Sequence, residues 1–303
     1  MSTNIQWTNQ TWNPTTGCDR ISPGCTNCYA LTMARRLKGM GQPKYQTDGH
    51  PATSGPGFGI TIHPDTLTEP LRWRKPRRVF VNSMSDLFHA RVPADFIARV
   101  WQTMQATPQH TYQILTKRAS RLPRIIDQIH DQLGLDEPLP NVWLGVSIES
   151  GRYTHRADHL RETPAAVRFI SAEPLLDPLD DLSLNGIDWL IIGGESGPGA
   201  RPLRLPWVED LLADAADSGT APFVKQLGSA WARDAHTGGR TVHNLGDTKG
   251  GNPEHWPAPL RVREYPHNPD TATPTPHKAT TNPDHPRDIP PTAHTTGPVA
   301  ADA

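Results

Sequence analysis

Short apolar runs alternate with helical patterns along most of this 303-residue chain, and this alternation constrains its fold more than any other feature. The runs are rich in Val, Ile, Leu and aromatic residues, which is typical of buried strands. Strands that alternate with helices pair in parallel through right-handed crossovers. Helices are expected at 94–106 and 122–133, where apolar residues recur at helical spacing. The expected strands lie at residues 5–12, 78–81, 112–115, 142–146, 167–170, 189–192 and 222–224.

Six or seven such units in about 230 residues predict an α/β fold, a full or partial (β/α) barrel of TIM type with parallel strands. A doubly wound open sheet shows the same alternation and is the alternative. After Pro266 the composition changes to Thr, Pro, His, Asp and Ala. Such a segment cannot bury enough apolar surface to offset its ordering entropy. We therefore predict a barrel domain over residues 1–265 and a disordered tail over residues 266–303.

All three cysteines of the chain lie within eleven residues, as Cys18, Cys25 and Cys28, in the spacing C-x6-C-x2-C. A disulfide would pair two of them and leave the third without a partner. Three thiolates from one loop are typical ligands of a soft metal centre, zinc or iron–sulfur, and they leave one coordination position open. We predict a metal centre here. The alternative is a chance cluster of unpaired, partly buried cysteines.

Polar residues follow every expected strand. In a parallel barrel these positions open on one face, and the cysteine loop, which also follows a strand, opens there too. We therefore expect a three-thiolate centre above a ring of polar side chains. The ring includes Asn82, Ser83, Ser85, Asp86, Thr116, Lys117, Arg118, Ser147, Glu149, Ser171, Glu173, Glu195, Lys225 and Gln226.

The charge balance of 30 basic and 31 acidic residues gives no general case for binding nucleic acid or an anionic membrane. A basic cluster at residues 72–78 could contact phosphates, although a solvated face is the simpler interpretation. No apolar run reaches the roughly 18 residues of a membrane span, and the N-terminus lacks the features of a signal peptide. Few cysteines and no signal indicate a reducing compartment. We predict a cytoplasmic protein without membrane association.

Several short motifs occur along the chain. They are Trp12-Asn13-Pro14, Gly17-Cys18, Gly24-Cys25, Asn27-Cys28-Tyr29-Ala30, Asn82-Ser83-Met84-Ser85-Asp86-Leu87-Phe88, Leu115-Thr116-Lys117-Arg118, Leu144-Gly145-Val146-Ser147, Ser171-Ala172-Glu173-Pro174-Leu175, Gly193-Gly194-Glu195-Ser196-Gly197 and Phe223-Val224-Lys225-Gln226. Over about residues 5–265 these motifs resemble the phage Gp37/Gp68 family. The cysteine loop is also similar to that of radical S-adenosylmethionine (SAM) enzymes, whose usual spacing is C-x3-C-x2-C.

The resemblance implies that Cys18, Cys25 and Cys28 hold a [4Fe–4S] cluster whose open iron takes the methionine end of SAM. It implies an enzyme that generates a 5′-deoxyadenosyl radical on a small-molecule or nucleic-acid-derived substrate, with an electron donor such as flavodoxin or ferredoxin. The superfamily's Gly-Gly-Glu element follows its second strand, but here it follows about the sixth, so we assign SAM binding to the group after the second strand. The expected cofactor-binding residues are Asn82, Ser83, Ser85, Asp86 and Tyr29, and the expected catalytic residues are Lys117, Glu149, Glu173, Glu195 and Lys225.

Two other functions would use the same cysteines. One is a structural Cys3His zinc site, completed by His50, His63 or His89, in a non-enzymatic phage or nucleic-acid-binding protein. The other is a simple electron carrier, although such proteins usually use four cysteines. A structural zinc site needs no barrel of this size and leaves the polar ring unexplained. These two features favour the enzyme.

Overall fold

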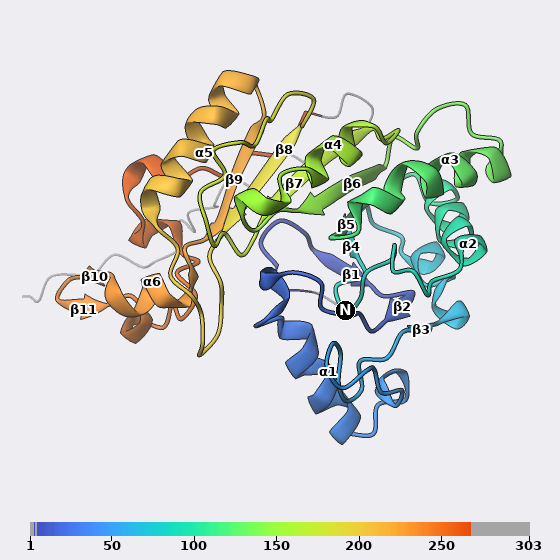
Figure 1. Cartoon of the computed structure of the whole chain (residues 1–303), viewed down its shortest axis with the longest axis horizontal. Coiled ribbons are helices and arrows are strands. Elements are labelled where there is room, and N and C mark those ends of the chain that lie inside the picture. Colours follow the sequence, from blue (N-terminus) through green and yellow to red (C-terminus); the bar gives the residue numbers. More distant parts are fainter. Residues whose placement is uncertain (1–2, 4, 268–303) are drawn as a thin grey trace, which may run out of the picture. The chain divides into compact units, whose positions relative to one another are not determined.

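The computed structural model describes residue 3 and residues 5–267. Seven strands form one sheet, and every neighbouring pair in it is parallel. A doubly wound sheet reverses its strand order at a switch point, whereas here the order follows the sequence, which confirms a partial (β/α) barrel (Figure 1). The strands in order are β1 (Gln10–Trp12), β4 (Arg78–Val81), β5 (Thr111–Thr116), β6 (Val142–Ser147), β7 (Val167–Ala172), β8 (Trp189–Gly193) and β9 (Ala221–Gln226).

Helices connect the strands, and Figure 1 shows α2, α3, α4 and α5 along one side of the sheet. α1 lies apart from them, next to an ordered insertion that follows it. Two strands outside the main sheet, β2 (Thr15–Thr16) and β3 (Thr61–Ile62), pair antiparallel and tie the insertion to the first strand. A second small pair joins β10 (His236–Thr237) to β11 (Arg240–Thr241). The helices are α1 (Tyr29–Gly39), α2 (Ala94–Gln105), α3 (Leu122–Leu133), α4 (Arg156–Arg161), α5 (Leu205–Ser218) and α6 (Gly228–Asp234).

The two faces of the sheet have separate cores, because successive strand residues point to opposite sides. Aliphatic residues such as Ile114 and Leu144 pack under the helices. The other face carries an aromatic cluster that includes Phe80, Trp143 and Trp189. Burial of this apolar surface on both faces positions the strand ends, where the polar residues begin.

The first strand is shorter than the sequence predicts. Strand pairing covers only residues 10–12, because Trp7 folds onto the aromatic face of the sheet. Its ring lies 4.7 Å from Phe80 and 6.1 Å from Trp189, between ring centroids. Tyr265, near the C-terminal end of the described residues, stacks on the same Trp189 with 5.4 Å between ring centroids. Residues 268–303, which hold almost all of the predicted tail, lie outside the described residues.

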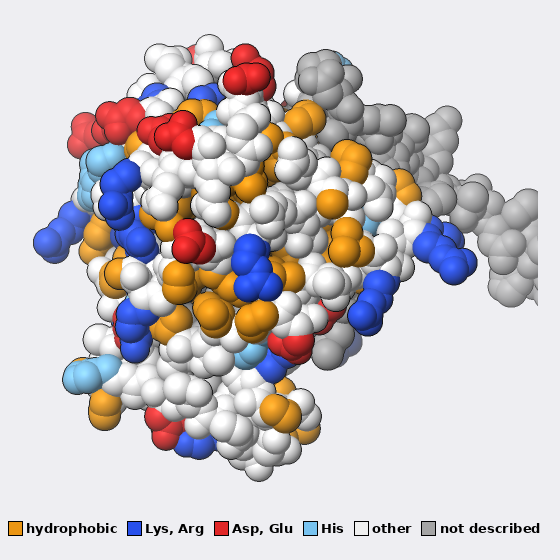
Figure 2. All heavy atoms as spheres, turned by 90° about the vertical axis from the view of Figure 1, so that its right-hand side faces the viewer, with side chains coloured by type: hydrophobic (Ala, Val, Ile, Leu, Met, Phe, Trp, Pro, Cys, Tyr) orange, Lys and Arg blue, Asp and Glu red, His pale blue; other side chains and the backbone are white. Residues whose placement is uncertain are grey.

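Charged and apolar side chains are interspersed on the face shown in Figure 2, in keeping with the near-neutral composition. In the part of the chain that the structure describes, none of the helices combines the length and the apolar character needed to cross a bilayer.

Candidate functional site

The three cysteines lie in a loop between β2 and α1. Gly17 begins this loop with a φ of 88°, which glycine adopts readily. A Cβ atom at Gly17 would lie 2.1 Å from the backbone oxygen of Gly59, so the insertion approaches too closely for any other residue. The loop ends at Cys28, directly before the first turn of α1. We call residues 17–28 the cysteine loop.

All three cysteines are half-buried free thiols. Cys18 and Cys28 pack against a small apolar cluster that includes Phe58 and Met84. Burial, helped by the negative charge of Asp86, raises the pKa of Cys18 to about 12. Burial also raises the pKa of Cys28. Both groups are therefore protonated near neutral pH, and metal binding would release their protons.

No three His, Cys, Asp or Glu side chains within the described residues converge closely enough to hold a metal ion. The donor chemistry nevertheless suits an iron–sulfur cluster, because three thiols come from one short loop and cations face two of them. Arg118 donates a hydrogen bond to Cys18, and the charge of Lys117 reaches Cys28. Cys25 interacts electrostatically with both other cysteines. The residues thus fit in chemistry and charge, since the thiolates of a [4Fe–4S] cluster bind different irons and need not converge on one ion.

The histidines expected to complete a zinc site have other hydrogen-bond partners. His89 accepts the backbone N–H of Arg91 at Nδ1, so its Nε2 carries the proton and donates to Asp19 at 2.9 Å. His63 and His50 each use one ring nitrogen in a hydrogen bond. A zinc ligand needs a bare ring nitrogen, and His89 has neither nitrogen to spare. These contacts argue against His89 as the fourth ligand of a Cys3His site, whereas His63 and His50 each use one ring nitrogen in the hydrogen bonds given above.

Asp86, five residues beyond β4, binds the end of the neighbouring strand β5. Its Oδ1 accepts from a backbone N–H and from the hydroxyl of Thr116 at 2.7 Å. Its Oδ2 accepts from the backbone N–H of Lys117 and, at 2.9 Å, from Arg118 Nη1. Four donors therefore occupy this carboxylate, which holds Arg118 beside Cys18. The SAM-binding role expected for Asp86 stays a prediction.

Glu149, two residues beyond β6, is fully buried and contacts the cysteine loop. Its Oε1 accepts the backbone N–H of Gly24 at 3.3 Å. Its Oε2 accepts from Lys117 Nζ at 3.2 Å and from Arg156 Nη1 at 2.9 Å. Burial would raise the pKa of Glu149, but the two cations and hydrogen bonds from the loop lower it. Glu149 is therefore an anion that ties the loop to the sheet.

Glu195, two residues beyond β8, holds the other part of the cysteine loop. Arg201 binds both of its carboxylate oxygens, at 2.5 and 3.0 Å, and also donates to the backbone oxygen of Pro23. The amide of Asn27 donates to Glu195 Oε2 at 3.0 Å. The bonds from Arg201 outweigh burial and lower the pKa of Glu195. The loop is thus fastened to two strands, β6 and β8.

Glu173 and Lys225 form a separate pair at the ends of β7 and β9. Lys225 Nζ lies 2.5 Å from Glu173 Oε1, and Gln226 also donates to that oxygen. The Glu173 side chain lies over Gly193, where a Cβ atom would come within 3.2 Å of it. The carboxylate is near enough to Tyr29 to help raise the pKa of that hydroxyl, after burial as the main cause. Within the part of the chain that the structure describes, the hydrogen bonds of this pair involve no residue of the cysteine loop.

The remaining predicted residues lie in the segment that directly follows β4 and, in the case of Tyr29, at the start of α1. Asn82 has a φ of 63°, is 3% exposed, and donates through Nδ2 to Thr15 at 2.8 Å. Its Oδ1 is buried and has no hydrogen-bond partner within the described residues. Ser85 also bonds to Thr15, and the hydroxyl of Tyr29 donates to the backbone oxygen of Ser83. A strained, buried asparagine with a free amide oxygen is typical of a ligand-binding position.

Three arginines complete the site, and we did not single them out as site residues from the sequence. Arg118 belongs to the polar ring and follows a predicted strand, so its position in the sequence could have indicated that it lies near the cysteine loop. Arg156 lies in α4 and Arg201 in the loop after β8, and neither carries a motif that links it to the cysteines. Their carboxylate partners lie seven and six residues away, but only the fold shows the contact.

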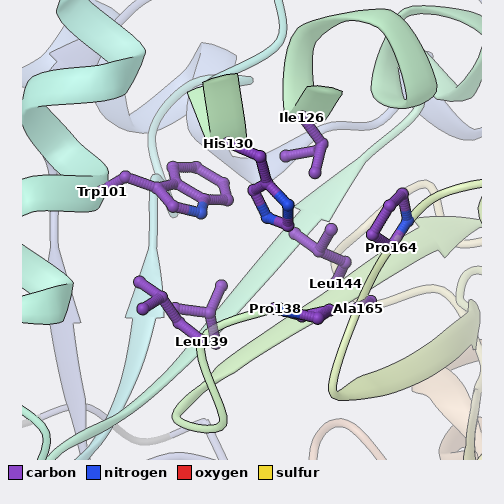
Figure 3. Close-up of a pocket in the computed structure, with 9 residues that line it drawn as sticks. Trp101, Ile126, His130, Pro138, Leu139, Leu144, Pro164 and Ala165 are labelled. Carbon is purple, nitrogen blue, oxygen red and sulfur yellow. The ribbon is translucent and has the colours of Figure 1, made fainter. Parts of the chain in front are cut away.

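Two other features lie at the amino-terminal ends of the strands, away from the cysteine loop. The basic cluster at residues 72–78 precedes β4, and Arg77 in it donates to the side chain of Gln10. A small pocket lies between α2, α3 and the segments that lead into β6 and β7, with Trp101 and His130 turned toward it (Figure 3). Neither feature belongs to the candidate site.

A family model with the description "Protein of unknown function (DUF5131)" matches residues 2–261. A search of curated proteins finds no match. Among solved structures, the chain is similar to "Spore photoproduct lyase complexed with dinucleoside spore photoproduct", with 13% sequence identity and a TM-score of 0.42. The match covers 72% of this chain and 64% of that one, which is less than two thirds of its length.

Proposed function

The chain belongs to the DUF5131 family of proteins of unknown function, and we propose that it is a cytoplasmic iron–sulfur enzyme of the radical SAM type. Cys18, Cys25 and Cys28 would bind three irons of a [4Fe–4S] cluster and leave the fourth iron for SAM. When bound and reduced, the cluster supplies the electron that cleaves a carbon–sulfur bond of SAM. A protein such as flavodoxin or ferredoxin would deliver that electron. The substrate would be a small molecule or derived from nucleic acid.

The observation that carries this proposal is the way in which the cysteine loop is held. Glu149 and Glu195 fasten it to two strands, and Arg118 contacts one of its thiols. A structural zinc site usually orders a loop that has few other contacts. A loop that protein contacts already order does not need its metal for folding. Its three thiols are then available for a reactive centre with one open position.

Asn82 supports a ligand beside that centre. Its buried Oδ1 is a free acceptor for an ammonium or hydroxyl group, both of which SAM carries. Holding a non-glycine residue at a φ of 63° costs on the order of 1 kcal/mol, which a binding role would explain. Asn82 directly follows β4 and lies four residues before Asp86, the carboxylate that orients Arg118 toward Cys18.

Glu173 and Lys225 are the residues that we assign to the substrate. Their side chains are 19% and 15% exposed, so the pair remains accessible from the strand-end face. A lysine and a carboxylate within hydrogen-bond distance can exchange a proton or orient a polar substrate group. The other predicted catalytic residues, Lys117, Glu149 and Glu195, would act by positioning the cysteine loop.

Anaerobic reconstitution of the full chain with iron and sulfide tests the proposal. We expect about four irons and four sulfides per chain, and cleavage of SAM to 5′-deoxyadenosine and methionine after reduction. Cys18→Ala, Cys25→Ala or Cys28→Ala should each abolish the cluster, because two thiolates hold it poorly. Stoichiometric zinc without labile sulfide, or a loaded and reduced cluster that leaves SAM intact, would contradict the assignment.

Asn82→Gly tests the SAM site separately. Glycine keeps the positive φ and removes the amide, so the fold and the iron content should stay while SAM affinity falls by about 1–2 kcal/mol. Asn185→Gly is the control, because this exposed asparagine precedes β8, at the opposite end of the strands from the cysteine loop. Equal SAM affinity in Asn82→Gly and the parent protein, measured by calorimetry on loaded protein, would remove Asn82 from the binding site.

A further inference from the structure

Arg118 is the cation most directly attached to the cysteine loop. Its Nη1 lies 3.4 Å from Cys18 Sγ and 2.9 Å from Asp86 Oδ2, and its Nη2 donates to the backbone oxygen of Asp19 at 3.1 Å. The side chain is 11% exposed, so water screens its charge weakly. A guanidinium keeps its proton in proteins, and Arg118 also has a counterion in Asp86, so it carries a positive charge beside the sulfur.

The three cysteine sulfurs therefore differ in the hydrogen-bond donors and charges that face them. Cys18 receives a hydrogen bond from a buried cation. Among the described residues, the hydrogen-bond partner of the Cys25 sulfur is the neutral hydroxyl of Ser22, with 3.8 Å between oxygen and sulfur. The helix start at Cys28 offers backbone N–H groups and the more distant charge of Lys117. A charged N–H donor stabilises negative charge on sulfur more than a neutral donor does.

We propose that Arg118 is a positioning residue that sets the reduction potential of the cluster through Cys18, an inference that rests on the proposed function. Hydrogen bonds and positive charge at ligand sulfurs favour the more reduced, more negative state of an iron–sulfur cluster. Asp86 holds the guanidinium in place from the neighbouring strand. Arg118 therefore raises the potential, and this effect acts on one defined ligand of the three.

A potentiometric titration of the reconstituted full chain tests this inference, with dithionite as the one-electron donor and the reduced cluster followed by its spin signal. Dithionite dissociates at its S–S bond into two SO2 radical anions, each of which gives one electron to a cluster and is oxidised to sulfite, and no bond of the protein is broken. Arg118→Gln should make the cluster harder to reduce. We expect about a tenfold lower ratio of reduced to oxidised cluster at a fixed potential, which equals about 59 mV for one electron.

Arg91→Gln is the matched control. Arg91 donates to the carboxylate of Asp19, next to Cys18, but it is 55% exposed and contacts Asp19 rather than the sulfur. The Arg91→Gln substitution therefore removes one positive charge next to the cysteine loop, but it removes no hydrogen bond to a cysteine sulfur. Its potential should stay close to that of the parent protein. Equal shifts in Arg91→Gln and Arg118→Gln would overturn the role of the hydrogen bond.

The outcomes separate this inference from the proposed function. If the parent protein assembles no cluster, both fail. If it assembles a cluster and Arg118→Gln has the parent potential, only the inference fails. If Arg118→Gln cannot hold a cluster, Arg118→Lys, which keeps the charge with a single donor, should show a smaller shift of the same sign. Loss of iron in both variants, with iron retained in Arg91→Gln, would assign Arg118 to assembly and overturn the proposal.

Discussion

Glu149 and Glu173 are the same residue type at the same level of neighbouring strands, yet they have different partners. Ser147 pairs with Ser171 across β6 and β7, and each glutamate follows two residues later. Glu149 is fully buried and binds the cysteine loop and two cations. Glu173 stays partly exposed and binds Lys225. The segment that folds over a strand end therefore decides the role of its carboxylate.

Glu195 extends this comparison to β8. It is 5% exposed and binds the cysteine loop, as Glu149 does from β6. Because β7 lies between β6 and β8, the loop is held on both sides of Glu173, whereas Lys225 reaches Glu173 from β9. Two carboxylates thus hold the loop, and the one between them is left for other chemistry. The difference can be tested by removing each carboxylate in turn.

The largest loss of stability should follow Glu149→Ala. The substitution leaves Lys117 and Arg156 without their shared counterion, and Arg156 is only 5% exposed. Breaking a buried ion pair by removing one partner costs about 3–5 kcal/mol. Urea denaturation at pH 7 measures the change in the free energy of unfolding. A further Arg156→Met change should recover part of the loss, because it removes one of the stranded charges.

Gly17→Ala should disturb the loop without touching either carboxylate. Alanine would have to adopt a φ of 88° with its Cβ in contact with the Gly59 backbone, and we expect a loss of about 2–3 kcal/mol. The cysteine thiols should also react faster with an aromatic disulfide reagent. Gly41→Ala is the control, because Gly41 has a φ of 71° in open space. A similar loss in both variants would show that backbone strain alone, and not loop contact, is responsible.

The fold was predictable because its strands are buried on both faces and read as apolar runs. The strand at residues 78–81 has the predicted bounds, and most others extend one or two residues further, where ladder hydrogen bonds continue into polar residues such as Thr116. The prediction failed in detail at residues 5–8. An aromatic residue such as Trp7 is typical of a strand, but it is equally suited to packing on the aromatic face of the sheet. The local sequence pattern does not distinguish these two positions.

The candidate site was predictable in its position but not in its internal contacts. Parallel strands place their carboxyl ends together, so the sequence correctly put Glu149 and Glu195 on the edge near the cysteine loop. It could not show that Gly24 lies against Glu149, because 125 residues separate them. The same holds for Arg201 and Pro23, which are 178 residues apart. Such contacts depend on how far the loop folds back, which no local pattern records.

Glu195→Gln should have an intermediate effect that depends on pH. The bonds from Arg201 lower the pKa of Glu195 in the folded state, despite burial. A carboxylate with a lowered pKa stabilises the fold above its unfolded pKa of about 4.3, and the contribution is lost as pH falls through the folded value. Glu195→Gln should therefore cost about 1–3 kcal/mol at pH 7 and progressively less below about pH 4. A difference that stays constant down to pH 3 would contradict this account.

Glu173→Gln should have the smallest effect on stability, although it lies between the two carboxylates that hold the loop. Both side chains of the Glu173–Lys225 pair are partly exposed, so water can solvate the lysine, and we expect a loss below about 1 kcal/mol. Iron content and SAM cleavage without substrate should persist, since neither residue contacts the cysteine loop in the described structure. Turnover of a substrate should fall, as it should in Lys225→Met. A loss of stability as large as that of Glu149→Ala would instead mean that the strand-end carboxylates form one structural set, and that the pair has no separate role.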